Sequence, residues 1–396
     1  MYVTMKKTLL IILALLISLS IVSVFVYLMV FGKPKDSSEV FAKFGLGNNS
    51  TISSNPSNTA STPQNTNTTV NVAPAKLQQL TTRPVAGAYV SDEHVRYVEQ
   101  GTGHVYEINL TTGKETLISG TTIPQTVNAL FSHDGTYTAI TAFTPTGTKT
   151  IVGDIIVDDK NGGKINGVSL PENAREVQFT TQGNGVYYLM KDNTGSVGYI
   201  YNIEKKTSGI LFNIPLRDVH VLWGNPLYVY TTPTNNQTGY IYKIDSKSTL
   251  RYVASGMRGL LVFRYSDGLA LTSVLKDKST IYTIDTEGTV STQALPYIPE
   301  KCVSEPTKNT LVFCGVPKNS IAATFPDNWY MGVVSSVDTL WSMDPYTGEA
   351  KPILDLLAES GQEIDVSRIG ISESGSLIYL INKNDNALWL YDRRVP

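Results

Sequence analysis

One short phrase recurs along most of the C-terminal part of this chain: an apolar residue, an aromatic residue, any residue, an apolar residue, and then Asp, Asn or Glu. Six clear copies begin at Val105, Ile200, Ile241, Ile281, Leu340 and Leu388, and a degenerate copy begins at Asp154. Most copies lie roughly 40–50 residues apart, which is the length of a β-propeller blade of four short strands. The repeat therefore predicts an all-β, seven-bladed β-propeller, with six or eight blades as alternatives.

Each repeat unit reads as an inner strand, a polar turn, a second strand, the repeated phrase as third strand, and an outer strand. Alternating apolar positions suit strands, and we expect the aromatic residues to pack between neighbouring sheets. The last unit reaches Pro396 without an outer strand, whereas residues 76–82 precede the first inner strand. We expect this N-terminal segment to complete the seventh blade, because closure removes an open sheet edge.

Two turns carry a resemblance to a known family. Ser132-His133-Asp134-Gly135 and Ser372-Glu373-Ser374-Gly375, each between apolar strands, resemble the S-x-D-G turn of the TolB-like and WD40-like (PD40) propeller repeats. The repeated phrase is similar to the next strand of those repeats, and the likeness covers most of residues 76–396. The third unit departs from the pattern, with Thr181-Gln182-Gly183-Asn184 at the turn. The resemblance implies an extracytoplasmic scaffold that presents binding loops, and no particular reaction.

The N-terminal segment predicts a membrane anchor. Residues 8–31 contain no charged side chain, and a helix of this length spans roughly 36 Å, enough to cross a hydrocarbon core of ~30 Å. A cleaved signal peptide is the alternative, but the run is long and no small-residue cleavage site follows it. We therefore expect a cytoplasmic tail at 1–7, a transmembrane helix at 8–31, a disordered Ser/Thr/Asn/Pro-rich linker at 32–75 and an extracytoplasmic propeller at 76–396.

Cys302 and Cys314 are the only cysteines. They lie equally far from the centre of a polar turn near Lys308, so a hairpin would place them opposite each other. We expect a disulfide, with two free buried thiols as the alternative. A disulfide suits an oxidising compartment outside the cytoplasm.

An insertion between Val316 and Val333 lengthens the sixth unit. It carries Phe325, Asp327, Trp329 and Tyr330, and it should emerge on the same face as three turns that each combine Lys with a nearby Asp. These turn residues are Lys191, Asp192, Lys276, Asp277, Lys383 and Asp385. Because loop aromatics are costly to expose unless they pack or bind, we predict that this face binds a protein, peptide or glycan at the cell envelope. In the alternative, the aromatics fold back and plug the funnel while the polar turns are merely solvated.

Composition and motifs exclude several other functions. The net charge is -2 and only 17% of residues are charged, so no nucleic-acid partner is expected. The four histidines are scattered without metal-ligand spacing, and no nucleophile motif is present. We therefore expect no catalytic residue, no cofactor, no metal site and no enzymatic activity. Two alternatives stay open: a propeller hydrolase or lyase acting on envelope polysaccharide, and a purely structural envelope protein.

Overall fold

The structure is a computed structural model of the 396-residue chain. It describes residues 75–157, 163–265, 268–275, 278–285, 288–293, 298–307, 311–319 and 324–396. The predicted transmembrane helix and all but the last residue of the predicted linker lie outside these ranges and stay predictions. Within the described ranges, no helix is long and apolar enough to cross a membrane.

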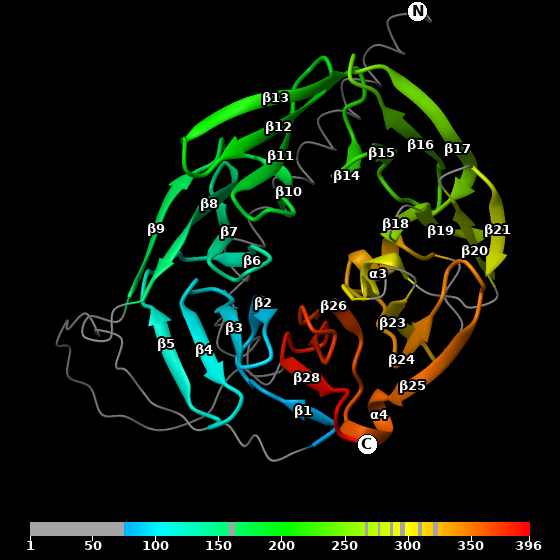
Figure 1. Cartoon of the computed structure of the whole chain (residues 1–396). Coiled ribbons are helices and arrows are strands. Elements are labelled where there is room, and N and C mark those ends of the chain that lie inside the picture. Colours follow the sequence, from blue (N-terminus) through cyan, green and yellow to red (C-terminus); the bar gives the residue numbers. More distant parts are fainter. Residues whose placement is uncertain are drawn as a thin grey trace, which may run out of the picture. The chain divides into compact units, whose positions relative to one another are not determined.

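Seven four-stranded antiparallel sheets form a ring, as the repeat predicted (Figure 1). Blade 1 contains β2 (Val85–Val90), β3 (His94–Glu99), β4 (Val105–Asn109) and β5 (Glu115–Ser119); blade 2 contains β6 (Thr126–Phe131), β7 (Tyr137–Thr144), β8 (Gly147–Ile156) and β9 (Lys164–Ser169). Blade 3 contains β10 (Arg175–Phe179), β11 (Gly185–Lys191), β12 (Ser196–Asn202) and β13 (Thr207–Ile214); blade 4 contains β14 (Val219–Leu222), β15 (Leu227–Thr231), β16 (Thr238–Ile244) and β17 (Leu250–Arg258).

The remaining three blades follow the same order around the ring. Blade 5 contains β18 (Leu261–Tyr265), β19 (Gly268–Leu275), β20 (Lys278–Ile284) and β21 (Val290–Gln293); blade 6 contains β22 (Cys302–Ser304), β23 (Val312–Pro317), β24 (Asp338–Met343) and β25 (Ala350–Asp355). Blade 7 contains β26 (Val366–Ile371), β27 (Leu377–Asn382), β28 (Leu388–Asp392) and β1 (Leu77–Gln79). Three short helices, η1 (Pro299–Lys301), α3 (Asp327–Tyr330) and α4 (Leu356–Ser360), lie in blade connections.

The six clear copies of the repeated phrase lie on the third strands of blades 1, 3, 4, 5, 6 and 7, as predicted. The degenerate copy starts in the third strand of blade 2, β8, and its last residue, Asp158, lies outside the described residues. In blades 1, 4, 5, 6 and 7 the terminal polar residue caps the turn that follows. The Asn109 carboxamide oxygen accepts the backbone N–H groups of Thr111 and Thr112, at 3.0 and 2.9 Å. The phrase therefore supplies both inter-blade packing and the turn to the outer strand.

The N-terminal strand closes the ring. β1 pairs with β28 through Leu77–Tyr391, Gln78–Leu390 and Gln79–Trp389. Leu77 is 7% exposed and packs into the core between blades 6 and 7. The predicted closure of the seventh blade is therefore confirmed.

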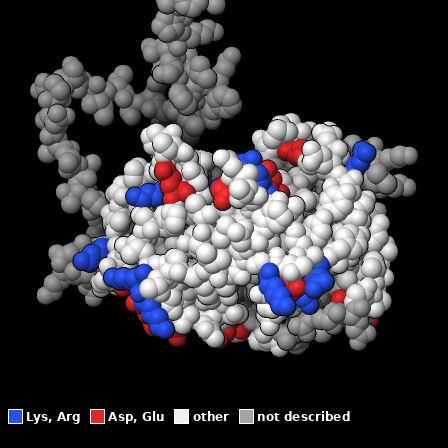
Figure 2. Space-filling model, turned by 90° about the horizontal axis from the view of Figure 1, so that it is seen from above, with Lys and Arg blue, Asp and Glu red and all other residues white. Residues whose placement is uncertain are grey.

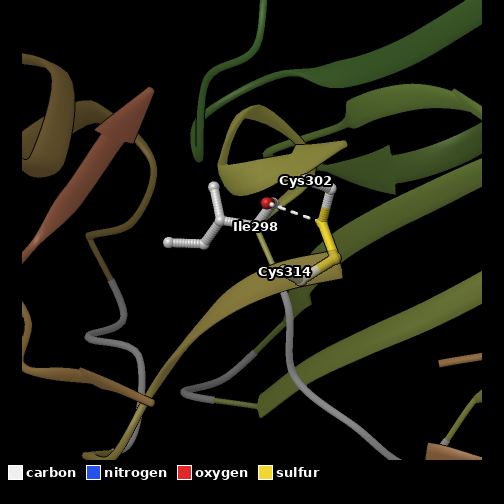
Figure 3. Close-up of a disulfide and its surroundings, with 3 residues drawn as sticks. All are labelled: Ile298, Cys302 and Cys314. Atoms are coloured by element: carbon white, nitrogen blue, oxygen red, sulfur yellow. Dashed lines mark hydrogen bonds between the residues drawn. A yellow bond between two sulfur atoms is a disulfide. The ribbon is translucent and has the colours of Figure 1, made fainter. Parts of the chain in front are cut away.

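The predicted disulfide joins the first two strands of blade 6 (Figure 3). Cys302 and Cys314 are directly opposite in the ladder, and both are buried. The hairpin symmetry inferred from the sequence therefore placed the two thiols correctly.

Charged side chains are sparse on the wall of the ring that faces the reader in Figure 2. Lysine and arginine side chains occur in small groups beside aspartate or glutamate, and uncharged surface separates these groups. The described residues of this face therefore present no continuous basic band.

Candidate functional site

The insertion of blade 6 folds over one end of the ring. We call this end the insertion face; it carries the loops between second and third strands and the connections from blade to blade. Within the insertion, the short helix α3 lies near the inner strands β18 and β26 (Figure 1). Residues of blades 4, 5 and 7 and of the connection before blade 6 hold the insertion in place.

Two of the predicted aromatic residues anchor the insertion. Phe325 and Trp329 are 3% and 6% exposed and pack with Leu261 of β18 and Ile298. Their ring centroids are 6.4 Å apart. These two side chains therefore fold back onto the ring, while the binding role predicted for the loop stays a prediction.

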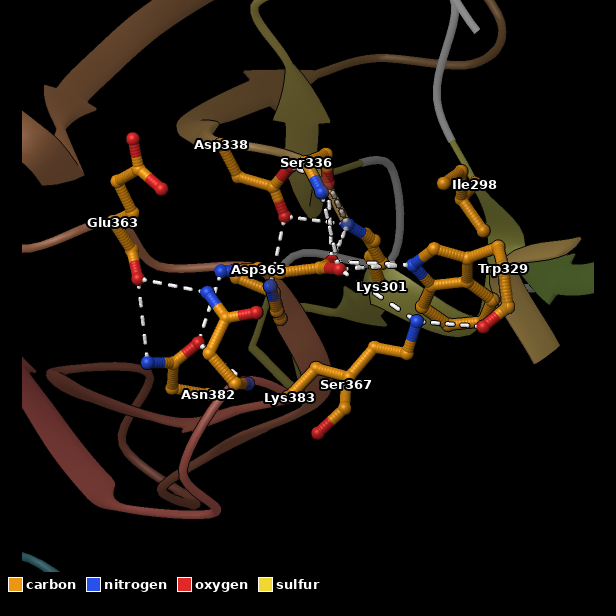
Figure 4. A network of polar contacts seen from close by, with 12 residues as sticks. Ile298, Lys301, Trp329, Ser336, Asp338, Glu363, Asp365, Ser367, Asn382 and Lys383 are labelled. Carbon is orange, nitrogen blue, oxygen red and sulfur yellow. Dashed lines mark hydrogen bonds and ion pairs between the residues drawn. The ribbon is translucent and has the colours of Figure 1, made fainter. Parts of the chain in front are cut away.

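A buried ionic network lies beneath Trp329 (Figure 4). The Lys301 Nζ donates to Asp338 at 2.7 Å and also to Asp365, and all three side chains are fully buried. Asp365 accepts the indole N–H of Trp329 at 3.1 Å and the backbone N–H of Ser336 at 3.1 Å. Burial raises the pKa of the Asp338 carboxyl, although Lys301 opposes this rise. The network therefore ties the insertion to blade 7 and to the connection before blade 6.

Lys383 supplies a second positive charge to this network. Its Nζ donates to the backbone oxygens of Trp329 and Val334, at 2.6 and 3.0 Å. It lies 4.6 Å from the Trp329 ring centroid and 3.9 Å from Asp365. Burial lowers the pKa of Lys383, whereas Asp365 opposes that change. Two ammonium groups thus face two carboxylates, so the network is close to neutral.

Asp327 attaches the insertion to blade 4. Its carboxylate accepts the backbone N–H of Asn235 at 2.8 Å and the Thr234 hydroxyl at 3.3 Å. Thr234 and Asn235 lie in the loop between β15 and β16. The insertion therefore reaches from blade 6 towards blades 4 and 7 across the insertion face.

The end of the insertion exposes apolar side chains. Tyr330, Met331 and Val333 are 49%, 66% and 68% exposed; we call these three residues the insertion tip. The backbone beside them is fixed, because Met331 and Val333 donate to the backbone oxygens of Asp327 and Asn328. Exposed apolar side chains on a backbone fixed by hydrogen bonds are typical of interaction sites.

The predicted Lys/Asp turns have different surroundings. Lys191 pairs with Asp218 at 2.8 Å, and this hydrogen bond lowers the pKa of Asp218. Asp192 accepts the hydroxyl and backbone N–H of Thr194 within its own turn, which lowers the pKa of Asp192. Asp385 accepts the backbone N–H of Ala387. The contacts of the described residues therefore bring Lys383 alone among these turn residues to the insertion.

The third turn, with Lys276 and Asp277, lies outside the described residues. Its predicted place on the binding face stays a prediction.

A second group of titratable side chains converges beside the insertion tip, and we call it the Glu300 cluster. Its members come from β10, β14, β15, η1 and α3: they are Glu176, His220, Tyr230, Glu300 and Tyr330. The Tyr330 hydroxyl donates to Glu300 Oε1, while Glu300 Oε2 is buried and has no hydrogen-bond partner among the described residues. On the other side, His220 Nδ1 lies 3.1 Å from Glu176 Oε1.

Burial dominates the electrostatics of the cluster. It raises the pKa of Glu300, and it raises the pKa values of Tyr230 and Tyr330, to which the negative charges of Glu300 and Glu176 also contribute. His220 stacks on Tyr230 with centroids 5.2 Å apart. Such perturbed groups concentrate at functional sites.

The backbone at Glu176 departs from regular strand geometry. This residue has φ of 51° and lies in a bulge of β10 between Arg175 and Gln178. A side chain other than glycine is strained there, and bulges often re-aim side chains next to functional sites. The sequence pointed to Tyr330 but not to Glu176, His220, Tyr230 or Glu300, because these residues lie in different blades or connections and share no spacing.

The opposite end of the ring contains open cavities. One of ≈ 530 Å³ is lined by Phe179, Tyr187 and Trp223 among others, and one of ≈ 310 Å³ is lined by Tyr89 and Tyr379 among others. Both are bordered by Phe131 and His133. The insertion in the sequence pointed to one end of the ring only, so these cavities were not predicted.

Comparisons with known proteins identify the fold and no closer kinship. No family model matches the sequence, and no curated protein sequence matches it. The chain is similar to the solved structure of oligogalacturonate lyase from Vibrio parahaemolyticus, with TM-score 0.52 and 10% identity over 83% of this chain and 96% of that one. It is also similar to the β-propeller domain of the Trilobed protease from Pyrococcus furiosus, with TM-score 0.51 and 13% identity over 78% and 95%.

A third similar structure corrects one expectation. Virginiamycin B lyase from Staphylococcus aureus matches with TM-score 0.50 and 12% identity, over 80% of this chain and 98% of that one. Two of these three propellers are lyases, so the expectation that this chain has no enzymatic activity does not stand. That expectation rested on missing sequence motifs, and a propeller assembles its central groups from separate blades, which motifs do not reveal.

Proposed function

We propose that this chain is a membrane-anchored, extracytoplasmic seven-bladed propeller of the TolB-like and WD40-like kind, which binds a protein or peptide at the cell envelope. The ligand lies on the insertion tip. The observation that carries the proposal is a set of three exposed apolar side chains on a loop that is fixed by a buried ionic network. Apolar anchors on a fixed backbone favour binding, because little loop entropy is lost on association.

The supporting contacts lie below the tip. Trp329 and Phe325 fill the space above β18, and Lys301, Asp338 and Asp365 fix the loop from beneath. A solvated loop would need no such support. The Cys302–Cys314 disulfide supports an oxidising, extracytoplasmic location, and residues 8–31 provide the anchor.

Photo-crosslinking in intact cells tests the proposal. The full-length chain would carry a benzophenone amino acid in place of Met331, and a matched variant would carry it in place of Tyr252, which is 64% exposed on the outer strand of blade 4. We expect one discrete protein or peptide adduct from position 331 and none of that mass from position 252. The double change M331S/V333S, combined with a crosslinker at Tyr330, should reduce this adduct.

The same adducts from both positions would contradict a site on the insertion tip. A melting temperature within error of the unmodified chain is the control that M331S/V333S leaves the fold intact, since both side chains are exposed.

A second candidate function is a lyase or hydrolase that acts on envelope polysaccharide. The observation in its favour is the Glu300 cluster, whose carboxylates, tyrosines and histidine are groups that transfer protons. Incubation of the full-length chain with envelope polysaccharide, followed by measurement of new reducing ends and unsaturated products, tests this candidate. Turnover that disappears in the E300Q variant would place the reaction at the cluster, and lack of turnover would leave binding as the function.

A further inference from the structure

We infer that Glu300 receives a basic side chain of the bound partner, and that this lysine or arginine lies next to the apolar residue that contacts the insertion tip. This inference rests on the proposed function and deepens it by naming the chemistry that the partner must present.

The first argument is the unused oxygen of Glu300. One carboxylate oxygen accepts the Tyr330 hydroxyl, whereas Oε2 is buried without a partner among the described residues. A buried acceptor without a donor costs free energy, and the cost of an ionised one is higher. A donor from outside removes this cost, and a cationic donor removes most of it.

The second argument is the charge balance around this oxygen. Lys301 is the next residue, but its ammonium group is directed to Asp338 and Asp365. Of the other groups in the cluster, Glu176 adds negative charge, Tyr230 and Tyr330 are neutral, and His220 is paired with Glu176. Burial raises the pKa of Glu300, and it outweighs the hydrogen bond from Tyr330 and the nearby His220 and Lys301, which lower that pKa. A cation from the partner would therefore supply the positive charge and the donor that Glu300 Oε2 lacks among the described residues.

The third argument separates an organic cation from a metal ion. No group of three or more His, Cys, Asp or Glu side chains in the described ranges has the geometry to hold a metal. A single carboxylate oxygen without a donor, next to the Tyr330 hydroxyl bond, instead suits an ammonium or guanidinium group, which donates charge-assisted hydrogen bonds.

The fourth argument links the cation to the insertion tip. Tyr330 belongs to both, because its hydroxyl donates to Glu300 while the residue as a whole is 49% exposed. A partner residue on Met331 and Val333 therefore lies within a few residues of one that reaches Glu300. The partner needs a basic residue flanked by apolar residues.

Two short peptides test the inference on the full-length chain in detergent. The first is an acetylated and amidated Leu-Lys-Leu tripeptide, and the second has the same sequence with an Nε-acetyl-lysine. Isothermal calorimetry at pH 7.5 should show about tenfold tighter binding of the first peptide, as a charge-assisted hydrogen bond provides. This preference should weaken as the pH falls and Glu300 is protonated.

Three variants make the test specific. The E300Q variant keeps an acceptor for Tyr330 and should bind both peptides equally. The E363Q variant removes an equal charge from an exposed position on the same face, and it should keep the preference. The Y330F variant keeps the Glu300 carboxylate and should also keep the preference for the first peptide. This variant provides a readout if E300Q does not fold.

Equal binding of the two peptides to the unmodified chain would overturn the inference, as would a preference that survives in E300Q. Absence of any binding up to millimolar peptide would overturn it too. If both peptides bind equally and M331S/V333S weakens both, the insertion tip is the binding site and only the cation assignment fails. The crosslinking experiment above decides the proposed function separately.

Discussion

Glu300 and Lys301 are adjacent in the chain, yet their charges meet opposite surroundings. The ammonium of Lys301 has two carboxylates and the Ser336 hydroxyl around it, whereas half of the Glu300 carboxylate has no partner among the described residues. The backbone of η1 turns one side chain into the core of blade 6 and the other towards the Glu300 cluster. Lys301 therefore holds the insertion, and Glu300 is the residue that we propose meets a ligand.

The K301M variant should be strongly destabilised. Removing the ammonium leaves Asp338 and Asp365 as uncompensated buried charges, a change that costs about 3–5 kcal/mol. Urea denaturation followed by tryptophan fluorescence would measure the loss. As a control, K318M removes the exposed pair of Lys318 with Asp355 and should leave the midpoint unchanged; equal effects of the two variants would contradict a structural role for the network.

The E300Q variant should be more stable than the unmodified chain at pH 8 but not at pH 4. Burial raises the folded-state pKa of Glu300 above its ordinary value of 4.5, so the folded protein binds this proton more tightly than the unfolded chain does. The resulting stabilisation is fully present below pH 4.5 and is lost as the pH rises through the folded-state pKa. Thermal melts at pH 4, 6 and 8 would measure this difference, and an unmodified chain that is the more stable at pH 8 would refute it.

At the scale of single elements, a disulfide and a packing contact hold two strands that are too short to be stable alone. β22 and β1 contain three residues each. The disulfide fastens β22 to β23, and packing of Leu77 and Leu80 fastens β1 to β28. Both contacts were predictable from the sequence. The two cysteines lie equally far from the centre of a hairpin turn, and the last repeat unit lacks the outer strand that the N-terminal segment can supply.

Reduction of the disulfide should cost about 2–3 kcal/mol, as expected for a loop of this length in the loop-entropy account. Denaturation with and without reductant would measure the cost, and C302A/C314A should match the reduced protein. Intact mass of unreduced protein from the cell envelope is the companion measurement. Two alkylatable thiols in that sample would contradict the predicted extracytoplasmic location.

The L80A variant should weaken the attachment of the N-terminal strand β1 to β28 in blade 7. Leu80 is 3% exposed and packs with Leu388 and Leu390, and loss of a leucine side chain at such a site costs about 2–5 kcal/mol. Differential scanning fluorimetry would show a lower melting temperature than in T82A, a change at the neighbouring exposed position. Equal melting temperatures would mean that β1 adds little to the ring.

At the scale of the whole molecule, the sequence predicted the repeated blades but not the contacts between residues of separate blades. Blade number, the third strands and the ring closure follow from a period, and a period is visible in one chain. The Lys301 network and the Glu300 cluster join residues from separate blades, such as Glu176 and Glu300, which only the folded ring brings together. The insertion was visible as a lengthened repeat, but burial of Phe325 and Trp329 and exposure of Met331 depend on tertiary packing.

Deletion of residues 1–31 should move the protein from the membrane fraction to the soluble fraction. The apolar run is long enough to span the bilayer, whereas no helix among the described residues is long and apolar enough to do so. Carbonate extraction and ultracentrifugation would measure the distribution. A deletion variant that still sediments with membranes would show that a second attachment exists.

The pairing of β1 with β28 also means that the ring can close only after its last strand has been synthesised. β1 is the first strand of the ring to leave the ribosome, and its partner is the last. During synthesis, therefore, β1 keeps an unpaired edge while six blades form behind it, and this edge can pair with chaperones or with other nascent copies. A chain that stops before β28 would leave β1 without its partner, so the ring could not close.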